Sequence, residues 1–268
     1  MLSLHQKWRY CAILFATGFL CANFAQAVGY KDVAFEGSLS SVPIPSNWVY
    51  EYQALGDVVV VGDGTTQGFL LSIGPNEAPE DYLSSVMGEM NASTLIDKIQ
   101  KLKIGGYDAA IIDNFGIVHE KYAAISKAGA LLIVYGTTKD DPLDLQKHLE
   151  LLAEKTEFYP SKHPEKLAGS YVVDATEDPS YVPTLDMGMY QERVTLNSSG
   201  AFGDLGFGEN DAIKIKNSEY LLGSWVQRGN RLIIEENNRH FVNYRLQTTS
   251  IGLTLIDQDG IRKHWVKQ

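Results

Sequence analysis

The alternation of hydrophobic and polar residues changes in character about 160 residues into the chain. Up to residue 159, strand-like runs are mixed with two segments whose apolar residues recur at helical spacing. One helix is predicted to begin at Pro79 and another at Pro142, because proline fits well in the first turn of a helix. From residue 160 onward the helical spacing disappears, and short alternating segments are separated by turns. We therefore predict two folded domains, residues 28–159 and 160–268.

The first domain is predicted to contain a sheet packed by a few helices. Its strands, rich in β-branched and aromatic residues, are expected at 47–52, 57–61, 68–73, 107–113, 117–126 and 130–135. Residues 94–103 fit either a helix or a strand. The buried stripe of the second helix contains Leu145, Leu149 and Leu152, and this spacing places His148 on the exposed side. Such a mixture is typical of an α+β fold or of a layered α/β/α sandwich.

The second domain is predicted to consist of strands and turns only. Its strands are expected at 168–174, 189–197, 219–228, 231–236, 240–247, 251–257 and 261–267. Regular hairpin spacing without helices indicates a small antiparallel β-barrel or a sandwich. The segment from Gly200 to Gly208 is glycine-rich, but no helix follows it, as a phosphate-binding loop would require. We expect this segment to be a mobile hairpin loop.

Residues 1–27 have the organisation of a secretory signal peptide. Lys7 and Arg9 precede an apolar run at 11–22, which is shorter than the ~20 residues that a typical membrane-spanning helix needs. Ala25-Gln26-Ala27 then matches a cleavage site. We expect cleavage after Ala27 and a periplasmic or secreted protein without stable membrane insertion. The alternative is an uncleaved membrane anchor.

Cysteine content and charge exclude several classes of function for residues 28–268. Both cysteines, Cys11 and Cys21, lie in the predicted signal peptide, so the mature chain has no disulfide, thiolate metal site or cysteine nucleophile. The whole chain has a net charge of −10, and residues 1–27 contain two basic residues and no acid, so the rest carries −12. A surface this acidic repels phosphate backbones, and we expect no nucleic-acid partner.

The first domain resembles the PsbP-like α/β/α sandwich family, which includes the DcrB-like bacterial proteins. The resemblance covers about 120 residues and is carried by Val42-Pro43 before Asn47-Trp48, the paired strands of 57–73, Gly105-Gly106-Tyr107-Asp108-Ala109-Ala110, the run 121–135 and the helix from Asp141. It implies an α/β/α sandwich with an antiparallel sheet. Members of this family are mostly non-catalytic accessory, assembly or binding proteins, so the resemblance implies no catalytic residue. Some occur with secretion systems, which adds an immunity-type or effector-associated role as an option.

The second domain resembles the small β-barrels of the lipocalin type. Leu167-Ala168-Gly169-Ser170-Tyr171 is similar to the opening G-x-W strand of that class, with tyrosine in place of tryptophan. Gly223-Ser224-Trp225 repeats the pattern in a later strand. The fold expected for the whole chain is therefore α+β, a sandwich followed by a small antiparallel barrel.

None of the local motifs assembles a catalytic or metal site. His119-Glu120 lacks the second histidine of a zinc helix, because Ala123 stands there, and we expect a solvated strand face. Asp257-Gln258-Asp259-Gly260 begins like a calcium loop, but a hairpin turn is the simpler interpretation. An acidic loop, with weak Ca²⁺ binding as the alternative, is expected from Asp174, Glu177, Asp178 and Asp186. We predict no catalytic residue, metal ion or cofactor.

The barrel interior is the one place where the sequence suggests a ligand site. If Val194 and Leu196 point inward, the period of two along a strand directs Tyr190 and Glu192 inward as well. A buried carboxylate needs a partner or water, because its isolated burial is very costly. We predict a cavity lined by Tyr171, Tyr190, Glu192, Trp225 and Tyr244, with a solvated Glu192 among ordinary core aromatics as the alternative.

These patterns favour an exported, non-enzymatic binding or adaptor protein. Its partner is expected to be an unidentified protein or a small molecule. One alternative is a hydrolase whose paired carboxylates lie far apart in the sequence. Another is a structural protein of the cell envelope.

Overall fold

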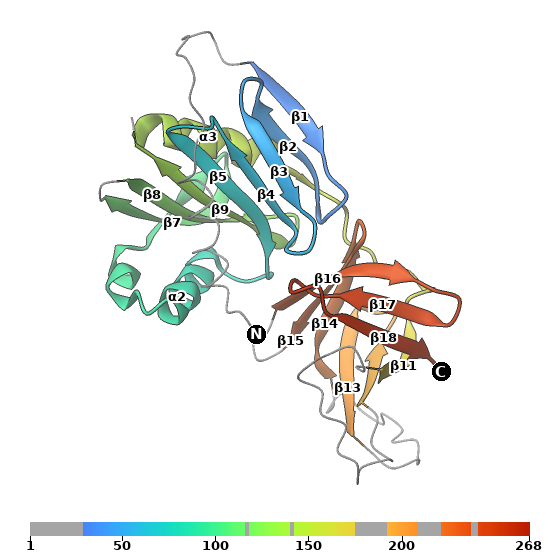
Figure 1. The fold of residues 1–268 in the computed structure, drawn as a ribbon. Coiled ribbons are helices and arrows are strands. Elements are labelled where there is room, and N and C mark those ends of the chain that lie inside the picture. The colour runs from blue at the N-terminus through green and yellow to red at the C-terminus, as the bar shows by residue number, and fades with distance from the viewer. Residues whose placement is uncertain (1–28, 116–117, 140–141, 175–191, 208–220, 237–240) are drawn as a thin grey trace. The chain divides into compact units, whose positions relative to one another are not determined.

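The structure is a computed structural model that describes residues 29–115, 118–139, 142–174, 192–207, 221–236 and 241–268. The chain forms two compact units. The first extends to Phe158, apart from Ala54–Gly56, and the second includes Tyr159–Gln268. Strands dominate both units, with few helices (Figure 1). The predicted signal peptide, residues 1–27, lies outside the described residues.

The first unit is built on a seven-stranded antiparallel sheet with the order β3-β4-β5-β9-β8-β7-β6. Its strands are β3 (Val49–Gln53), β4 (Val58–Gly62), β5 (Gln67–Gly74), β6 (Gln100–Ile104), β7 (Tyr107–Phe115), β8 (His119–Lys127) and β9 (Ala130–Thr138). The antiparallel sheet predicted from the sequence is confirmed. Both interpretations of residues 94–103 are realised in succession, as the 3-10 helix η1 (Ser93–Lys98) and then β6.

A smaller sheet, missed by the sequence patterns, contains β1 (Tyr30–Ala34), β2 (Leu39–Pro45) and β10 (Glu157–Phe158) in the order β1-β2-β10. Pro43 and Pro45 make β2 difficult to recognise in the sequence, because proline cannot donate a hydrogen bond to a neighbouring strand and is usually confined to sheet edges. Here both prolines pair with β1 on one side of β2. On the other side, β10 reaches only Leu39 and Ser41, so no described strand lies opposite the prolines there.

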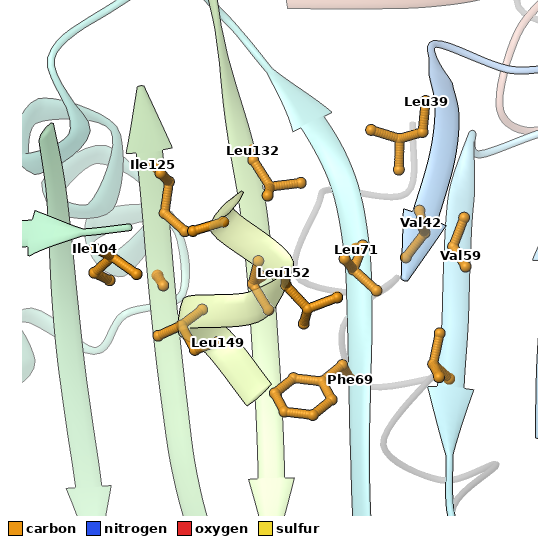
Figure 2. Packing of buried hydrophobic residues seen from close by; sticks show 14 of the residues in the cluster. Leu39, Val42, Val59, Phe69, Leu71, Ile104, Ile125, Leu132, Leu149 and Leu152 are labelled. Carbon is orange, nitrogen blue, oxygen red and sulfur yellow. The ribbon is translucent and has the colours of Figure 1, made fainter. Parts of the chain in front are cut away.

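The two faces of the seven-stranded sheet carry separate hydrophobic clusters, as the two-residue period of strands requires. One cluster packs the sheet against α3 (Pro142–Lys155) and β2, and Figure 2 shows Leu149 and Leu152 of α3 directed toward the sheet. The opposite cluster packs α2 (Pro79–Glu89) and η1 against the other face. Both helices begin at the predicted prolines. No helix in the described part of the chain is long and apolar enough to cross a bilayer.

The second unit is a closed antiparallel barrel of eight strands. They are β11 (Gly169–Asp174), β12 (Glu192–Leu196), β13 (Ala201–Phe207), β14 (Leu221–Arg228), β15 (Arg231–Glu236), β16 (Phe241–Thr248), β17 (Gly252–Ile256) and β18 (Arg262–Lys267). Each strand pairs with the next, and β18 pairs with β11 to close the barrel. The predicted antiparallel barrel is confirmed.

The glycine-rich segment after Gly200 corrects one prediction. It was expected to be a mobile hairpin loop, but its first part is strand β13, which pairs with β12 and β14. Phe202 is buried in the barrel core. Gly203 and Gly206 have no side chains and so interrupt the alternation by which strands are recognised.

Candidate functional site

The candidate site is the interior of the barrel. Strand registers bring inward-facing side chains of all eight strands together in one apolar cluster, because paired residues in a ladder share a face. The cluster contains Leu167, Tyr171, Val173, Val194, Leu196, Phe202, Trp225, Leu232, Ile234, Leu246, Leu253, Leu255 and Trp265, with Tyr244 packed against it. Three of the five residues predicted to line a cavity, Tyr171, Trp225 and Tyr244, therefore meet in this interior.

Two of these aromatic residues are fixed by hydrogen bonds at the same end of the barrel. The Tyr171 hydroxyl donates to the Leu167 carbonyl at 2.6 Å, and the Trp225 indole N–H donates to the Asn197 carbonyl at 2.7 Å. Leu167 precedes β11 and Asn197 follows β12, and the pairing of Gly169 with Leu196 brings these strand ends together. Burial raises the pKa of Tyr171, which keeps the hydroxyl neutral and able to donate. These two bonds hold both side chains at this end of the barrel.

Trp265 is different, because its polar atom has no partner among the residues that the structure describes. The residue is 4% exposed, lies in the interior cluster, and its ring centroid is 6.0 Å from that of Tyr171. Its Nε1 is buried and finds no hydrogen-bond acceptor within the described ranges. A buried donor without an acceptor costs about 1–3 kcal/mol, so such a group usually meets water or a ligand. Trp265 therefore places a hydrogen-bond donor within the apolar cluster.

The remaining predicted lining residues are placed as follows. Tyr244 is half-buried on β16, where it pairs with Leu232 of the core. Tyr190 lies outside the described residues, as does the side chain of Glu192, although the backbone of Glu192 begins β12. Trp265 was missed because the inward positions on either side of it, Lys263 and Lys267, are charged and leave no apolar stripe. A tryptophan at a strand centre was the signal that could have identified it.

His119 and Glu120, expected on a solvated strand face, are instead half-buried on β8. The Glu120 carboxylate accepts hydrogen bonds from the Tyr135 hydroxyl at 2.6 Å and from the Asn114 amide nitrogen at 2.8 Å. Burial raises the pKa of Tyr122, beside Tyr135, to about 12, and the charge on Glu120 adds to the shift. Burial and the bond to Glu120 also raise the pKa of Tyr135. This network holds neighbouring strands together. The prediction of a solvated strand face at His119 and Glu120 was therefore wrong.

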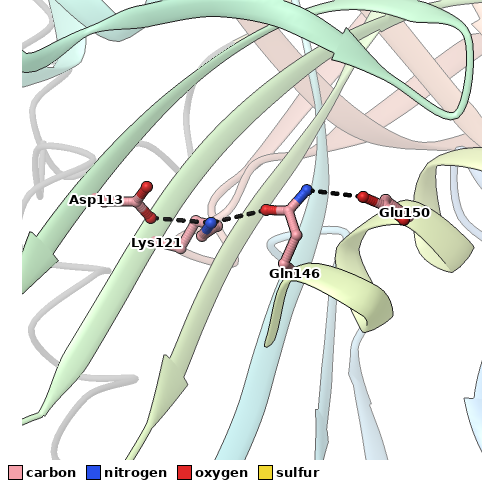
Figure 3. Close-up of polar contacts among 4 residues, drawn as sticks. All are labelled: Asp113, Lys121, Gln146 and Glu150. Carbon is pink, nitrogen blue, oxygen red and sulfur yellow. Dashed lines mark hydrogen bonds and ion pairs between the residues drawn. The ribbon is translucent and has the colours of Figure 1, made fainter. Parts of the chain in front are cut away.

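A second polar chain connects α3 to the sheet (Figure 3). Lys121 on β8 lies 3.0 Å from the Asp113 carboxylate on β7, and its ammonium donates to Gln146 on α3 at 2.8 Å. Gln146 in turn donates to Glu150 at 3.1 Å. All four of these groups have partners. The series of polar contacts therefore joins α3 to the sheet, and none of the four groups is left for a substrate.

His148 corrects another prediction. It was expected on the exposed side of its helix, yet it is half-buried, with its ring 4.9 Å from Trp48 and 5.8 Å from Phe69. Tyr30 lies within hydrogen-bond distance of Nδ1, at 3.0 Å. Helical spacing identifies only the stripe that faces the main sheet, and the N-terminal strands cover a second side of α3.

The remaining acidic motifs are the turn at Asp257 and the predicted acidic loop. Asp257 accepts hydrogen bonds from the backbone N–H groups of Asp259 at 2.8 Å and Ile261 at 3.0 Å, as a hairpin turn requires. The predicted acidic loop lies outside the described residues, apart from the backbone of Asp174 in β11. Within the described ranges, no group of three or more histidine, cysteine or acidic residues is arranged to hold a metal ion.

Comparison with known proteins adds no identification. No protein-family model matches the sequence, and no curated protein matches it.

Proposed function

We propose that this is an exported, non-enzymatic binding protein whose barrel holds a small ligand with an apolar body and a hydrogen-bond acceptor. The observation that carries the proposal is the buried Trp265 N–H, which lacks an acceptor among the described residues of the barrel. The surrounding side chains are aliphatic or aromatic, so they favour an apolar ligand body. A carbonyl, carboxylate or sulfonate oxygen would satisfy the N–H.

The position of the other aromatic residues indicates where such a ligand would enter. Tyr171 and Trp225 donate their hydrogen bonds to the backbone at one end of the barrel, so they are not available to a ligand. We infer entry from the opposite end, where β11 ends at Asp174 and β12 begins at Glu192. Tyr190, Glu192 and Tyr244 belong to this proposal as residues that contact the ligand, as the sequence predicted.

The finer fold relationships are part of the same proposal. The helices on both faces of the antiparallel sheet support a PsbP-like α/β/α sandwich for the first unit. The closed meander, with Tyr171 near the start of its first strand, supports a lipocalin-type barrel for the second. Both relationships favour binding over catalysis, and the predicted signal peptide favours a periplasmic or secreted location.

Calorimetric titration of residues 28–268 with 8-anilinonaphthalene-1-sulfonate tests the proposal, because this probe combines aromatic rings with an anionic acceptor. We expect saturable binding of one probe per chain, with competition by dodecanoate. Trp265→Phe keeps an aromatic ring at this position but removes the indole N–H, and should weaken binding about 5- to 30-fold, since one hydrogen bond contributes about 1–2 kcal/mol.

Trp48→Phe is the matched control, because Trp48 belongs to the core of the first unit. It should leave the affinity for the probe unchanged. The absence of saturable binding, or equal weakening by Trp48→Phe and Trp265→Phe, would contradict the proposal.

A further inference from the structure

The two edge strands of the seven-stranded sheet differ in how they are protected. Exposed edges invite pairing with other chains, and natural proteins block them with charged residues, especially lysine. The edge strand β6 carries two such lysines, Lys101, paired with Glu80, and Lys103, paired with Asp108 at 2.8 Å. The edge strand of the smaller sheet, β1, likewise carries an exposed Lys31 and Asp32.

The opposite edge, β3, is less protected, because Glu51 is its one charged residue. Its sequence, Val-Tyr-Glu-Tyr-Gln, contains no lysine or proline, and its register with β4 runs without a bulge from Val49 to Gln53. Among the described strands, β4 is its only partner. Val49 is 68% exposed and Tyr50 is 46% exposed. An exposed strand of β-branched and aromatic residues is a template for a further strand.

The side chains of β3 define what a further strand would meet. Val49 and Glu51 share one face with their register partners on β4, Gly62 and Val60. Tyr50 lies on the other face, where its ring centroid is 5.9 Å from that of Phe35, and the Lys31 ammonium lies 5.4 Å above it. The edge therefore offers an apolar position, then an exposed carboxylate two residues later on the same face.

A second copy of the chain fits this edge poorly. The antiparallel register that pairs all five residues of β3 with another β3 is centred on Glu51 and places the two Glu51 carboxylates opposite each other. Like charges at directly opposed positions are destabilising. The net charge of −10 on each chain opposes self-association further.

We propose that β3 accepts an extended segment of another protein as an added strand, and that this segment carries lysine or arginine opposite Glu51 and apolar residues beside it. Backbone hydrogen bonds would supply the affinity and the Glu51 pair the specificity, as in other cases of strand addition. This surface lies in the first unit and does not depend on the ligand proposed for the barrel.

The test uses a fluorescent peptide, acetyl-Thr-Val-Thr-Lys-Thr-Val-Thr-amide, whose lysine and valines share one face. In anisotropy titrations with residues 28–268, it should bind about tenfold more tightly than the same peptide with glutamate at the centre. The central lysine attracts Glu51, whereas a central glutamate repels it. N-methylation of alternate backbone nitrogens of the peptide should weaken binding at least as much as the exchange of lysine for glutamate, because it removes the N–H groups that donate to β3. Glu51→Lys should reverse the preference between the two peptides.

Asp97→Lys is the matched control, since Asp97 is an exposed acid on η1, away from β3. It should leave the lysine preference unchanged, and thermal unfolding should show that both variants fold. The proposal is overturned if no peptide binds at 1 mM, if N-methylation has no effect, or if Asp97→Lys reverses the preference as Glu51→Lys does. Sedimentation that shows a dimer abolished by Glu51→Lys would assign the edge to a second copy and overturn it as well.

Discussion

Single residues in the first unit carry interactions whose loss can be measured. Asp63, in the turn before β5, accepts hydrogen bonds from the backbone N–H groups of Thr65, Thr66 and Gln67 at 2.7, 2.8 and 3.0 Å. The Thr66 hydroxyl donates a fourth bond at 2.7 Å. Partial burial alone would raise the pKa of Asp63, but these hydrogen bonds together lower it.

A lowered pKa in the folded state has a defined effect on stability. The contribution of Asp63 is present above the pKa of the unfolded chain, about 3.9, and is lost as pH falls through the lower folded-state pKa. We therefore predict that Asp63→Asn destabilises the protein at pH 6, and that the difference from the unmodified protein shrinks below pH 4. Urea unfolding across pH 2–7 measures this, and a difference that grows on acidification would contradict it.

The bond between Tyr135 and Glu120 supports a second prediction at this scale. Tyr135→Phe removes the hydroxyl that donates to Glu120 and leaves one oxygen of a half-buried carboxylate without that donor. Loss of such a donor costs about 1–3 kcal/mol. We expect a decrease of this size in the free energy of unfolding, measured in urea at pH 7. The bond has no stabilising role if Tyr135→Phe is as stable as the unmodified protein.

At the scale of elements, the contact between α3 and β9 depends on a missing side chain. A Cβ at Gly136 would lie 2.8 Å from both Leu145 Cδ1 and Phe69 Cε1. Gly136→Ala should therefore lower the free energy of unfolding by about 1–3 kcal/mol, the usual cost of overpacking a core.

Gly88 in α2 provides the matched control. A Cβ there meets no atom within 4 Å. Gly88→Ala should stabilise the protein by up to about 1 kcal/mol, because alanine favours the helix. Equal effects of the two substitutions in thermal unfolding would show that α3 does not pack closely against β9.

There are physical reasons why the sequence predicted some strands and missed others. β4 and β9 are continuous apolar runs with strong β-propensity and are recognisable without tertiary information. β2 was missed because Pro43 interrupts the pattern, and β13 because Gly203 and Gly206 have no side chain to alternate. These strands form because neighbouring strands supply their hydrogen bonds, which a single segment does not reveal.

The candidate site was predictable in part for the same reason. The sequence predicted Tyr171, Trp225 and Tyr244 as lining residues of the barrel, because all three fall on predicted strands of the second domain. It could not show that Tyr171 and Trp225 donate to backbone carbonyls, because those acceptors depend on how strand ends meet. Trp265 was missed because lysines occupy the flanking inward positions.

At the scale of the whole molecule, the two units provide different surfaces for recognition. The apolar cluster of the barrel includes the buried Trp265 N–H, which has no acceptor among the described residues, whereas the first unit has an edge strand, β3, without lysine or proline. The polar networks around Glu120 and Lys121 join strands and helices to one another. Both surfaces belong to the binding role that we propose.

The most direct measurement is native mass spectrometry of the protein isolated without denaturant from the cells that make it. We predict a mature chain that begins after Ala27 and retains one non-covalent small molecule, which Trp265→Phe largely loses. A bare chain, or a companion retained equally by the variant, would contradict the proposal that the barrel interior is a binding site.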